Sequence, residues 1–217
     1  MNILQKNILS EVKQYCLTLE QEFHLIPDER KDFLTQLSLY ISKKIEEKLI
    51  PSIVVICTHN SRRSHLGQIW LSIGADFYEL PPILTFSGGT ESTALNQRVV
   101  TALCKIGLKI QSSKKISPDN PIYEIDWGQK DAPYLAFSKR YREAPNPTDA
   151  FAAIMVCSEA DEGCPIVKGA DFRLSLPYDD PKTFDDTAQE SSKYDERCQQ
   201  IGREMLFVLS KVKTALF

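Results

Sequence analysis

The sequence predicts an α/β domain, a doubly wound four-stranded parallel sheet with helices on both faces, and two patterns indicate it. Residues 53–56 are Ile-Val-Val-Ile, a short β-branched run typical of a parallel strand that is buried on both faces. Further apolar runs then alternate with helical stretches, which is the pattern of a parallel sheet. The chain has 217 residues, 42% of them hydrophobic, and can bury one sizeable core.

An N-terminal helical hairpin is predicted before this domain. The first fifty residues have helical periodicity, with Val12 on one face and Leu34 and Ile41 on another. The pattern changes abruptly at residue 51. We therefore expect a helical extension of residues 1–50 and an α/β domain of residues 51–217, with the extension as a candidate contact for a homodimer.

The elements of the domain follow one another in the order strand, helix, strand, helix. Each strand is expected where apolar residues run together, and each helix where they recur with helical spacing. Gly107 is expected to cap the C-terminus of the second of these helices. The expected strands are residues 53–56, 83–86, 151–156 and 172–176, and the expected helices span about residues 64–73, 92–106 and 185–212.

Residues 109–150 interrupt this alternation. They contain five prolines and two aromatic-rich runs, residues 122–127 and 134–137. We expect an inserted hairpin or lid that is stabilised by packing on the sheet.

Composition limits the classes of partner. A formal net charge of −3 leaves no basic surplus, so neither nucleic acid nor an anionic membrane is an expected partner. The six cysteines are an even set, but the chain is long for a disulfide-stapled scaffold and starts without a secretory hydrophobic region. No apolar run approaches the roughly 18 residues of a membrane span. We therefore expect a cytoplasmic protein with free thiols.

Cys57 ends the first strand and comes shortly before a helix. A turn in that position directs backbone N–H groups into one concavity, which binds tetrahedral oxyanions. The same field favours thiolate over thiol, so Cys57 is the expected nucleophile. Arg63 is expected to clamp two anion oxygens, Ser64 to donate a hydrogen bond to the thiolate, and Asn60 to hold a left-handed turn. The Cys-x5-Arg spacing by itself is a weak signal, because it can arise by chance, and the position of the turn between a strand and a helix carries the prediction.

Residues 54–64 resemble the oxyanion loop of the low-molecular-weight protein tyrosine phosphatase superfamily, which includes the thioredoxin-coupled arsenate reductases. The resemblance covers about residues 51–215, with further matches at residues 87–90 and 106–108, the strand into Cys157, and Asp180-Pro181. His59 stands where the family usually has glycine, and Arg62 where it often has cysteine. The oxyanion-binding residues that the resemblance implies are Thr58, His59, Asn60, Ser61, Arg62, Arg63 and Ser64.

A proton donor is needed when a phosphoryl or arsenyl group is transferred to a thiolate, because the departing oxygen must be protonated. The segment Tyr178-Asp179-Asp180-Pro181 follows the last predicted strand, where a loop can lie over the anion site. The resemblance implies that Asp180 is the general acid, with Asp179 as the less favoured neighbour. The alternative is an ordinary turn that begins with Asp-Pro.

A second pair of cysteines follows the third predicted strand. Cys157 ends that strand and Cys164 comes seven residues later, on a polar segment that can close a small disulfide loop if it bends back. There is no Cys-x2-Cys, and the chain has only three histidines, so neither zinc nor another metal or cofactor is expected. Redox exchange is the favoured interpretation, and two small buried hydrophobic residues are the alternative.

This pair resembles the resolving cysteines of thioredoxin-coupled arsenate reductases, which ordinary phosphatase relatives lack. The resemblance implies a relay in which Cys57 attacks arsenate, Cys157 attacks the sulfur of Cys57, and Cys164 passes the disulfide to thioredoxin. The catalytic residues that it implies are Cys57, Arg63, Asp180, Cys157 and Cys164.

Three functions remain open at this point. The leading hypothesis is an arsenate reductase, and the second is a protein tyrosine phosphatase that hydrolyses phosphotyrosine through a phosphocysteine intermediate. The third is a non-catalytic oxyanion-binding module whose helical extension is the working part. Arsenate and phosphate are similar tetrahedral oxyanions, so the loop alone does not separate them.

The remaining cysteines are expected to be structural, with Cys104 in the core and Cys16 and Cys198 on helices. His65 is expected to be a partly exposed helix residue.

Overall fold

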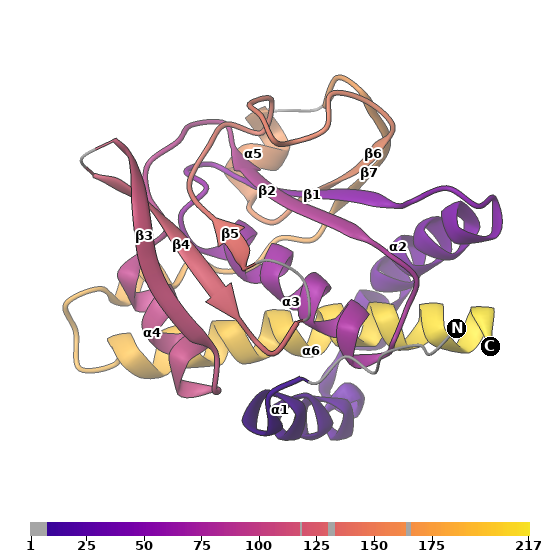
Figure 1. The fold of residues 1–217 in the computed structure, drawn as a ribbon, viewed down its shortest axis with the longest axis horizontal. Coiled ribbons are helices and arrows are strands. Elements are labelled where there is room, and N and C mark those ends of the chain that lie inside the picture. Colours follow the sequence, from indigo (N-terminus) through magenta and orange to yellow (C-terminus); the bar gives the residue numbers. More distant parts are fainter. Residues whose placement is uncertain (1–7, 118, 130–132, 164–165) are drawn as a thin grey trace.

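The computed structural model describes residues 8–117, 119–129, 133–163 and 166–217. Its main sheet has four parallel strands in the order β2-β1-β6-β7 (Figure 1). The predicted α/β fold with a four-stranded parallel sheet is confirmed. The strands are β1 (Ser52–Cys57), β2 (Leu84–Gly89), β6 (Phe151–Met155) and β7 (Ala170–Ser175).

Strand β1 lies inside the sheet and pairs with β2 on one side and β6 on the other. Ile56 is in register with Gly88 of β2 and with Met155 of β6. The carboxyl ends of these three strands therefore meet at one edge. Both faces of β1 are covered from Ile53 to Cys57, which explains why its sequence is continuously apolar.

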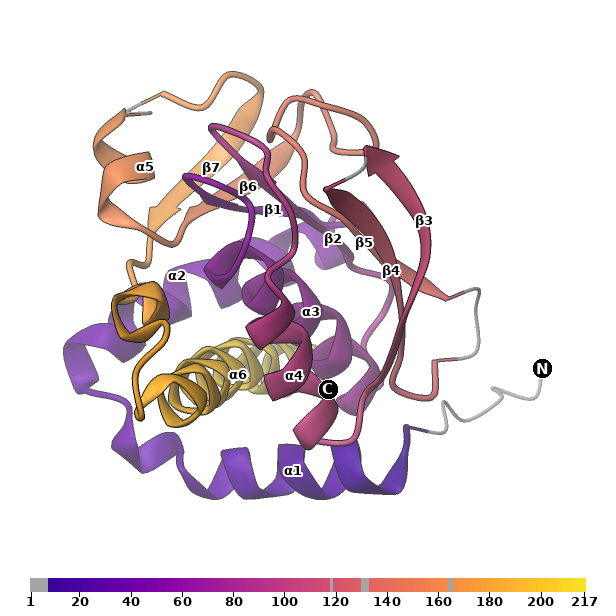
Figure 2. The same ribbon diagram turned by 90° about the vertical axis from the view of Figure 1, so that its left-hand side faces the viewer.

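Helix α3 (Arg63–Phe77) lies between the sheet and the long helix α6 (Glu190–Leu216), as Figure 2 shows. Two glycines permit the close approach of the helices, because a Cβ at Gly74 would lie 2.6 Å from Leu209 and one at Gly202 2.6 Å from Trp70. The other helices of the domain are α4 (Gln97–Lys105), the short α5 (Ser158–Gly163) and the 3₁₀ helix η2 (Pro181–Phe184).

Helices α4 and α6 each begin about five residues later than predicted. The side chain of Asn96 accepts a hydrogen bond from the N–H of Arg98 and so fixes the start of α4. Gly107 follows α4 with a φ of +99°, as expected of a C-terminal cap.

The N-terminal helices differ in arrangement from the predicted hairpin. Helices α1 (Ser10–Gln21) and α2 (Asp28–Glu46) are joined through the 3₁₀ turn η1 (Phe23–Leu25), but each packs on α6 rather than mainly on the other (Figure 2). Their apolar faces enter the common core. Tyr15 of α1 also stacks on Trp70 of α3, with ring centroids 5.8 Å apart.

The insertion forms a separate antiparallel sheet in the order β3-β4-β5, with three strands instead of the two of a hairpin. Its strands are β3 (Lys109–Ser117), β4 (Asn120–Asp126) and β5 (Tyr134–Ala136). The indole N–H of Trp127 donates to Asp76 of α3 at 2.9 Å, and the Tyr134 hydroxyl lies 2.8 Å from that of Thr85 on β2. These contacts fasten the insertion beside the main sheet. Among the described helices, none combines the length and apolarity that crossing a bilayer requires.

We expect Gly202→Ala to lower the free energy of unfolding by about 1–3 kcal/mol, because the added methyl group overpacks the rigid indole of Trp70. Urea denaturation measures the change. The control is Gly163→Ala, whose Cβ would meet nothing within 4 Å and which replaces glycine by a better helix former. Equal stability losses in the two variants would contradict the close packing of α3 on α6.

Candidate active site

Cys57 lies at the carboxyl edge of the sheet, where β1 turns into α3. The turn comprises residues 58–62, and the first hydrogen bond of α3 runs from the N–H of Leu66 to the carbonyl of Arg62. Because the first N–H groups of a helix lack intrahelical acceptors, this end of α3 offers donors to an anion. Asn60 has a φ of +45°, the left-handed conformation that was predicted for it.

The sulfur of Cys57 is held by a chain of two polar side chains. Its Sγ lies 3.1 Å from the Oγ of Ser64, and that oxygen accepts a hydrogen bond from Nδ2 of Asn60 at 2.9 Å. The Ser64 hydroxyl thus has its proton free to donate toward the sulfur. All three residues are buried.

The turn is braced from outside by the chain that leaves the insertion. The Oδ1 of Asn60 accepts from the backbone N–H of Lys139 at 2.8 Å, and the carbonyl of His59 accepts from the Ser138 hydroxyl at 3.2 Å. Gly89 lies so close that a Cβ there would stand 2.6 Å from the carbonyl oxygen of Thr58. The sequence around Ser138 and Lys139 has no motif that indicates this contact.

His65 is fully buried, so the prediction of a partly exposed helix residue is wrong. Burial and the nearby Lys139 lower the pKa of His65 to about 3. The imidazole is therefore neutral. Since Nε2 lies 3.0 Å from the Asn60 carbonyl, which only accepts, Nε2 carries the proton and Nδ1 accepts from the Ser87 hydroxyl at 3.3 Å. His65 thereby fixes the backbone of the turn.

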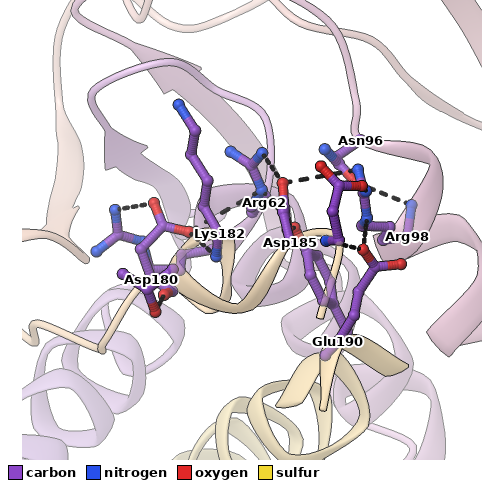
Figure 3. A network of polar contacts seen from close by, with 11 residues as sticks. Arg62, Asn96, Arg98, Asp180, Lys182, Asp185 and Glu190 are labelled. Carbon is purple, nitrogen blue, oxygen red and sulfur yellow. Dashed lines mark hydrogen bonds and ion pairs between the residues drawn. The ribbon is translucent and has the colours of Figure 1, made fainter. Parts of the chain in front are cut away.

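Arg63, the first residue of α3, is 93% buried and joins the turn to the loop after β7. One guanidinium nitrogen donates to the carbonyl of Tyr178 at 2.7 Å, and the other donates to Oδ2 of Asp180 at 2.7 Å. Oδ1 of Asp180 accepts from the N–H of Lys182 and caps η2 (Figure 3). The predicted arginine clamp and the predicted acid are thus in direct contact.

Arg62 lies on the other side of Asp180, with its Nε 4.0 Å from Oδ1, and also belongs to a second network (Figure 3). Its Nε donates to the Tyr194 hydroxyl at 2.8 Å, and a terminal nitrogen lies 3.4 Å from Asp185. Arg98 lies 3.6 Å from the same carboxylate and 2.7 Å from Glu190. The network ties the start of α3 to the segment before α6.

The other predicted loop residues occupy different positions. Ser61 is buried and its carbonyl accepts from the N–H of Asn96 at 3.0 Å. The side chain of His59 is half-exposed, and its Nε2 lies 3.9 Å from Glu91. Thr58 faces the next strand, where its Oγ1 lies 3.4 Å from the sulfur of Cys157.

Cys157 follows β6 and is completely buried. Its pKa is raised mainly by burial, while the hydroxyl of Thr58 acts in the opposite direction. Cys157 is therefore a thiol in the resting protein. The adjoining helix α5 is held by Asp161, which accepts from Arg173 and from the Ser175 hydroxyl. Cys164 lies outside the described residues.

A groove of about 550 Å³ opens beside the turn. Arg63 and Asp180 reach it, and Phe184 is an aromatic residue on its lining. Within the described part of the chain, no three His, Cys, Asp or Glu side chains gather as ligands for a metal ion. The groove residues are Arg63, Ser158, Glu159, Tyr178, Asp179, Asp180, Pro181, Thr183, Phe184, Lys193, Glu196 and Arg197.

The remaining cysteines differ in burial. Cys16 and Cys198 are buried, and burial raises the pKa of each to about 12, so both are unreactive thiols. Cys104 is exposed, which corrects its predicted place in the core. The buried face of α4 carries Val99, Val100, Ala102 and Leu103, and Cys104 falls outside it.

We expect Ser64→Ala to slow the alkylation of Cys57 by iodoacetamide at neutral pH by about tenfold, because the thiolate loses a hydrogen bond worth roughly 1.5 kcal/mol. Mass spectrometry of the Cys57 peptide measures the rate. Ser38→Ala, at a buried serine of α2, is the control and should leave the rate unchanged. An unchanged rate in Ser64→Ala would show that the hydroxyl does not support the thiolate.

Lys139 generates a prediction about pH. Burial lowers its pKa to about 8 from the ordinary 10.5, so its charge destabilises the folded state below pH 8, and this penalty disappears as pH rises from 8 to 10.5. We expect Lys139→Met to be more stable than the wild type at pH 7, by on the order of 1–3 kcal/mol, with the gain vanishing toward pH 10.5.

Urea denaturation across this pH range measures the effect. The control is Lys13→Met, at an exposed lysine of α1, for which no such pH-dependent gain is expected. A Lys139→Met variant that is equally stable with the wild type at pH 7 would contradict the penalty.

No family model matches this chain. Two curated proteins, arsenate reductase 2 and arsenate reductase from two strains of Staphylococcus epidermidis, are each 24% identical to it over 132 residues, which is 60% of this chain and 78% of theirs. Among solved structures, a low-molecular-weight phosphotyrosine phosphatase from Vibrio cholerae aligns with 74% of this chain and 95% of its own, at 13% identity and a TM-score of 0.48. Primo-1 aligns with 71% and 95%, at 12% identity and a TM-score of 0.42. The chain is thus similar in sequence to arsenate reductases, which confirms the resemblance predicted from its cysteine turn.

Proposed function

We propose that this chain is an enzyme of the arsenate reductase type, with Cys57 as its nucleophile. The observation that carries the proposal is the second thiol: Cys157 follows the neighbouring strand β6 and lies within hydrogen-bond distance of Thr58, the residue after Cys57. Hydrolysis of a phosphate ester has no use for a second thiol at this place. Reduction of an oxyanion requires one, because two electrons must be supplied.

Binding of arsenate begins with an exchange of partners at Arg63. The guanidinium that holds Asp180 in the ligand-free chain turns its N–H groups to two oxygens of the entering anion. The N–H groups at the start of α3 bind the same anion. Asp180 then loses its ion pair with Arg63 while Arg62 remains near its other oxygen, and, once protonated, it donates a proton to the oxygen that leaves as water.

The relay conserves atoms and electrons. The Cys57 thiolate attacks arsenic, forms an S–As bond and displaces water. The Cys157 thiolate next attacks the sulfur of Cys57, so that an S–S bond forms, the S–As bond breaks and its electron pair leaves with arsenic as arsenite. Cys164 then attacks Cys157 and releases the Cys57 thiolate, and a dithiol of the thioredoxin type reduces the 157–164 disulfide.

The two described thiols are suited to act in this order. Cys57 accepts a hydrogen bond from Ser64 and can attack first, whereas burial raises the pKa of Cys157 and keeps its proton in place until the reaction reaches it. This order of reaction avoids a disulfide between Cys57 and Cys157 before arsenate has been bound. A mechanism that consumes free thiols fits a reducing compartment such as the cytoplasm.

A phosphotyrosine phosphatase is the second candidate, and the groove beside Arg63 favours it. Phe184 lines that groove and suits an aromatic ring next to a bound phosphate. In this case Cys57 and Asp180 serve a phosphocysteine intermediate, and the second pair of thiols is dispensable.

Arsenite release in the presence of arsenate, thioredoxin, thioredoxin reductase and NADPH tests the proposal. We expect Cys57→Ser to form no arsenite, because the nucleophile is lost. Cys157→Ser should bind arsenate without reducing it. Cys164→Ser should release about a single equivalent of arsenite and then stop, because its 57–157 disulfide is not passed on.

The control is Cys104→Ser, which removes an exposed thiol of α4 and should keep the full rate. Undiminished turnover by Cys164→Ser would contradict the relay. Hydrolysis of an aryl phosphate that survives the loss of both Cys157 and Cys164, without arsenite formation by the wild type, would support the phosphatase instead.

A further inference from the structure

A buried ion pair connects the N-terminal extension to the loop that carries Asp180. Arg30 of α2 donates from Nε to Oε2 of Glu204 on α6 at 2.9 Å. The same carboxylate oxygen accepts from the hydroxyl of Tyr178 at 2.7 Å, and the Arg30 guanidinium lies 4.6 Å from the centroid of the Tyr178 ring. Glu204 is 98% buried and Tyr178 96% buried.

Tyr178 transmits this contact to the site through its backbone. Its N–H donates to the carbonyl of Val156 at 3.2 Å, and its carbonyl accepts from Arg63 at 2.7 Å. Asp180 follows two residues later and binds the other end of the same guanidinium. The side chain of Tyr178 is therefore fixed by the ion pair, while its main chain holds the arginine clamp and leads into the acid.

The hydrogen bonds of Glu204 with Arg30 and Tyr178 are strong because they involve a buried carboxylate. A hydrogen bond to a carboxylate is about twice as strong as one between neutral groups, and its strength increases in a buried site. Burial and Glu204 both raise the pKa of Tyr178, so its hydroxyl remains a donor at every physiological pH. Removing the charge of Arg30 leaves the Glu204 carboxylate without its cation, which weakens the hold on Tyr178.

We propose that Arg30, acting through Glu204 and Tyr178, is a positioning residue that aligns Asp180 for proton transfer to the leaving oxygen. This role rests on the function proposed above. It gives the extension a part in the chemistry, although Arg30 does not touch the substrate.

A double-mutant cycle tests the role through the rate of arsenite formation. We expect Arg30→Met to lower kcat about tenfold in the wild-type background, since misalignment removes part of the acid contribution. In the Asp180→Asn background the same change should lower kcat less than about twofold, because there is no acid left to align. A merely structural role would reduce both rates by the same factor.

The matched control is Arg203→Met. Arg203 lies on α6 and pairs with Glu22 at 3.1 Å, so it also joins α6 to the N-terminal segment, but it has no contact with Tyr178 in this network. It should change kcat less than about twofold in both backgrounds. Thermal unfolding of every variant verifies the fold.

Tyr178→Phe provides a second variant if Arg30→Met does not fold. It removes the hydroxyl that binds Glu204 and keeps the ring and the backbone carbonyl. We expect the same loss in the wild-type background and the same insensitivity in the Asp180→Asn background. Arg30→Lys, which retains the charge without the planar fork, should recover part of the rate.

Two results would overturn this role. Equal losses for Arg30→Met and Tyr178→Phe in both backgrounds would assign the ion pair to stability alone. No loss in either variant would exclude a role in catalysis. A wild-type chain that forms no arsenite, and whose Cys57 is not protected from alkylation by inorganic phosphate, would instead contradict the proposed function itself.

Discussion

Parallel strands end at a common edge, and in this molecule that edge gathers the carboxyl ends of β2, β1 and β6. Because β1 lies between the other two, Cys57 has Gly89 on one side and, on the other, the end of β6, which Cys157 follows by two residues. The glycine leaves room for the turn, and the second strand supplies the second thiol. The arrangement of strands thus brings Thr58, the residue after Cys57, within 3.4 Å of the sulfur of Cys157, which is far away in the sequence.

Much of this could be predicted because the signals are local. A β-branched run predicted β1, helical spacing predicted α3 and α6, and a cysteine directly before a helix predicted the turn. The left-handed Asn60 follows from the same reasoning, since few residue types tolerate that conformation. Resemblance to a known loop added Asp180, which lies against Arg63.

The features that could not be predicted depend on tertiary packing, that is, on which helix or strand covers a given apolar face. Periodicity identifies the apolar face of a helix but not the element against which that face packs. The sequence therefore did not distinguish a helical hairpin from two helices that each pack on α6. For the same reason His65 was expected to be partly exposed and Cys104 buried, each the reverse of its place in the structure. The contact of Lys139 with the turn and that of Arg30 with Glu204 join residues that no local pattern relates.

The packing of α1 and α2 on α6 also bears on how the chain folds. Arg30 and Glu204 are 174 positions apart, and Glu22 and Arg203 are 181 apart. Such contacts close long loops of chain. The conformational entropy of these loops must be lost before the contacts can stabilise the fold. During synthesis the apolar faces of α1 and α2 stay exposed until α6 has been made and can cover them. Exposed apolar faces of this kind are sites for chaperone binding until the end of the domain has left the ribosome.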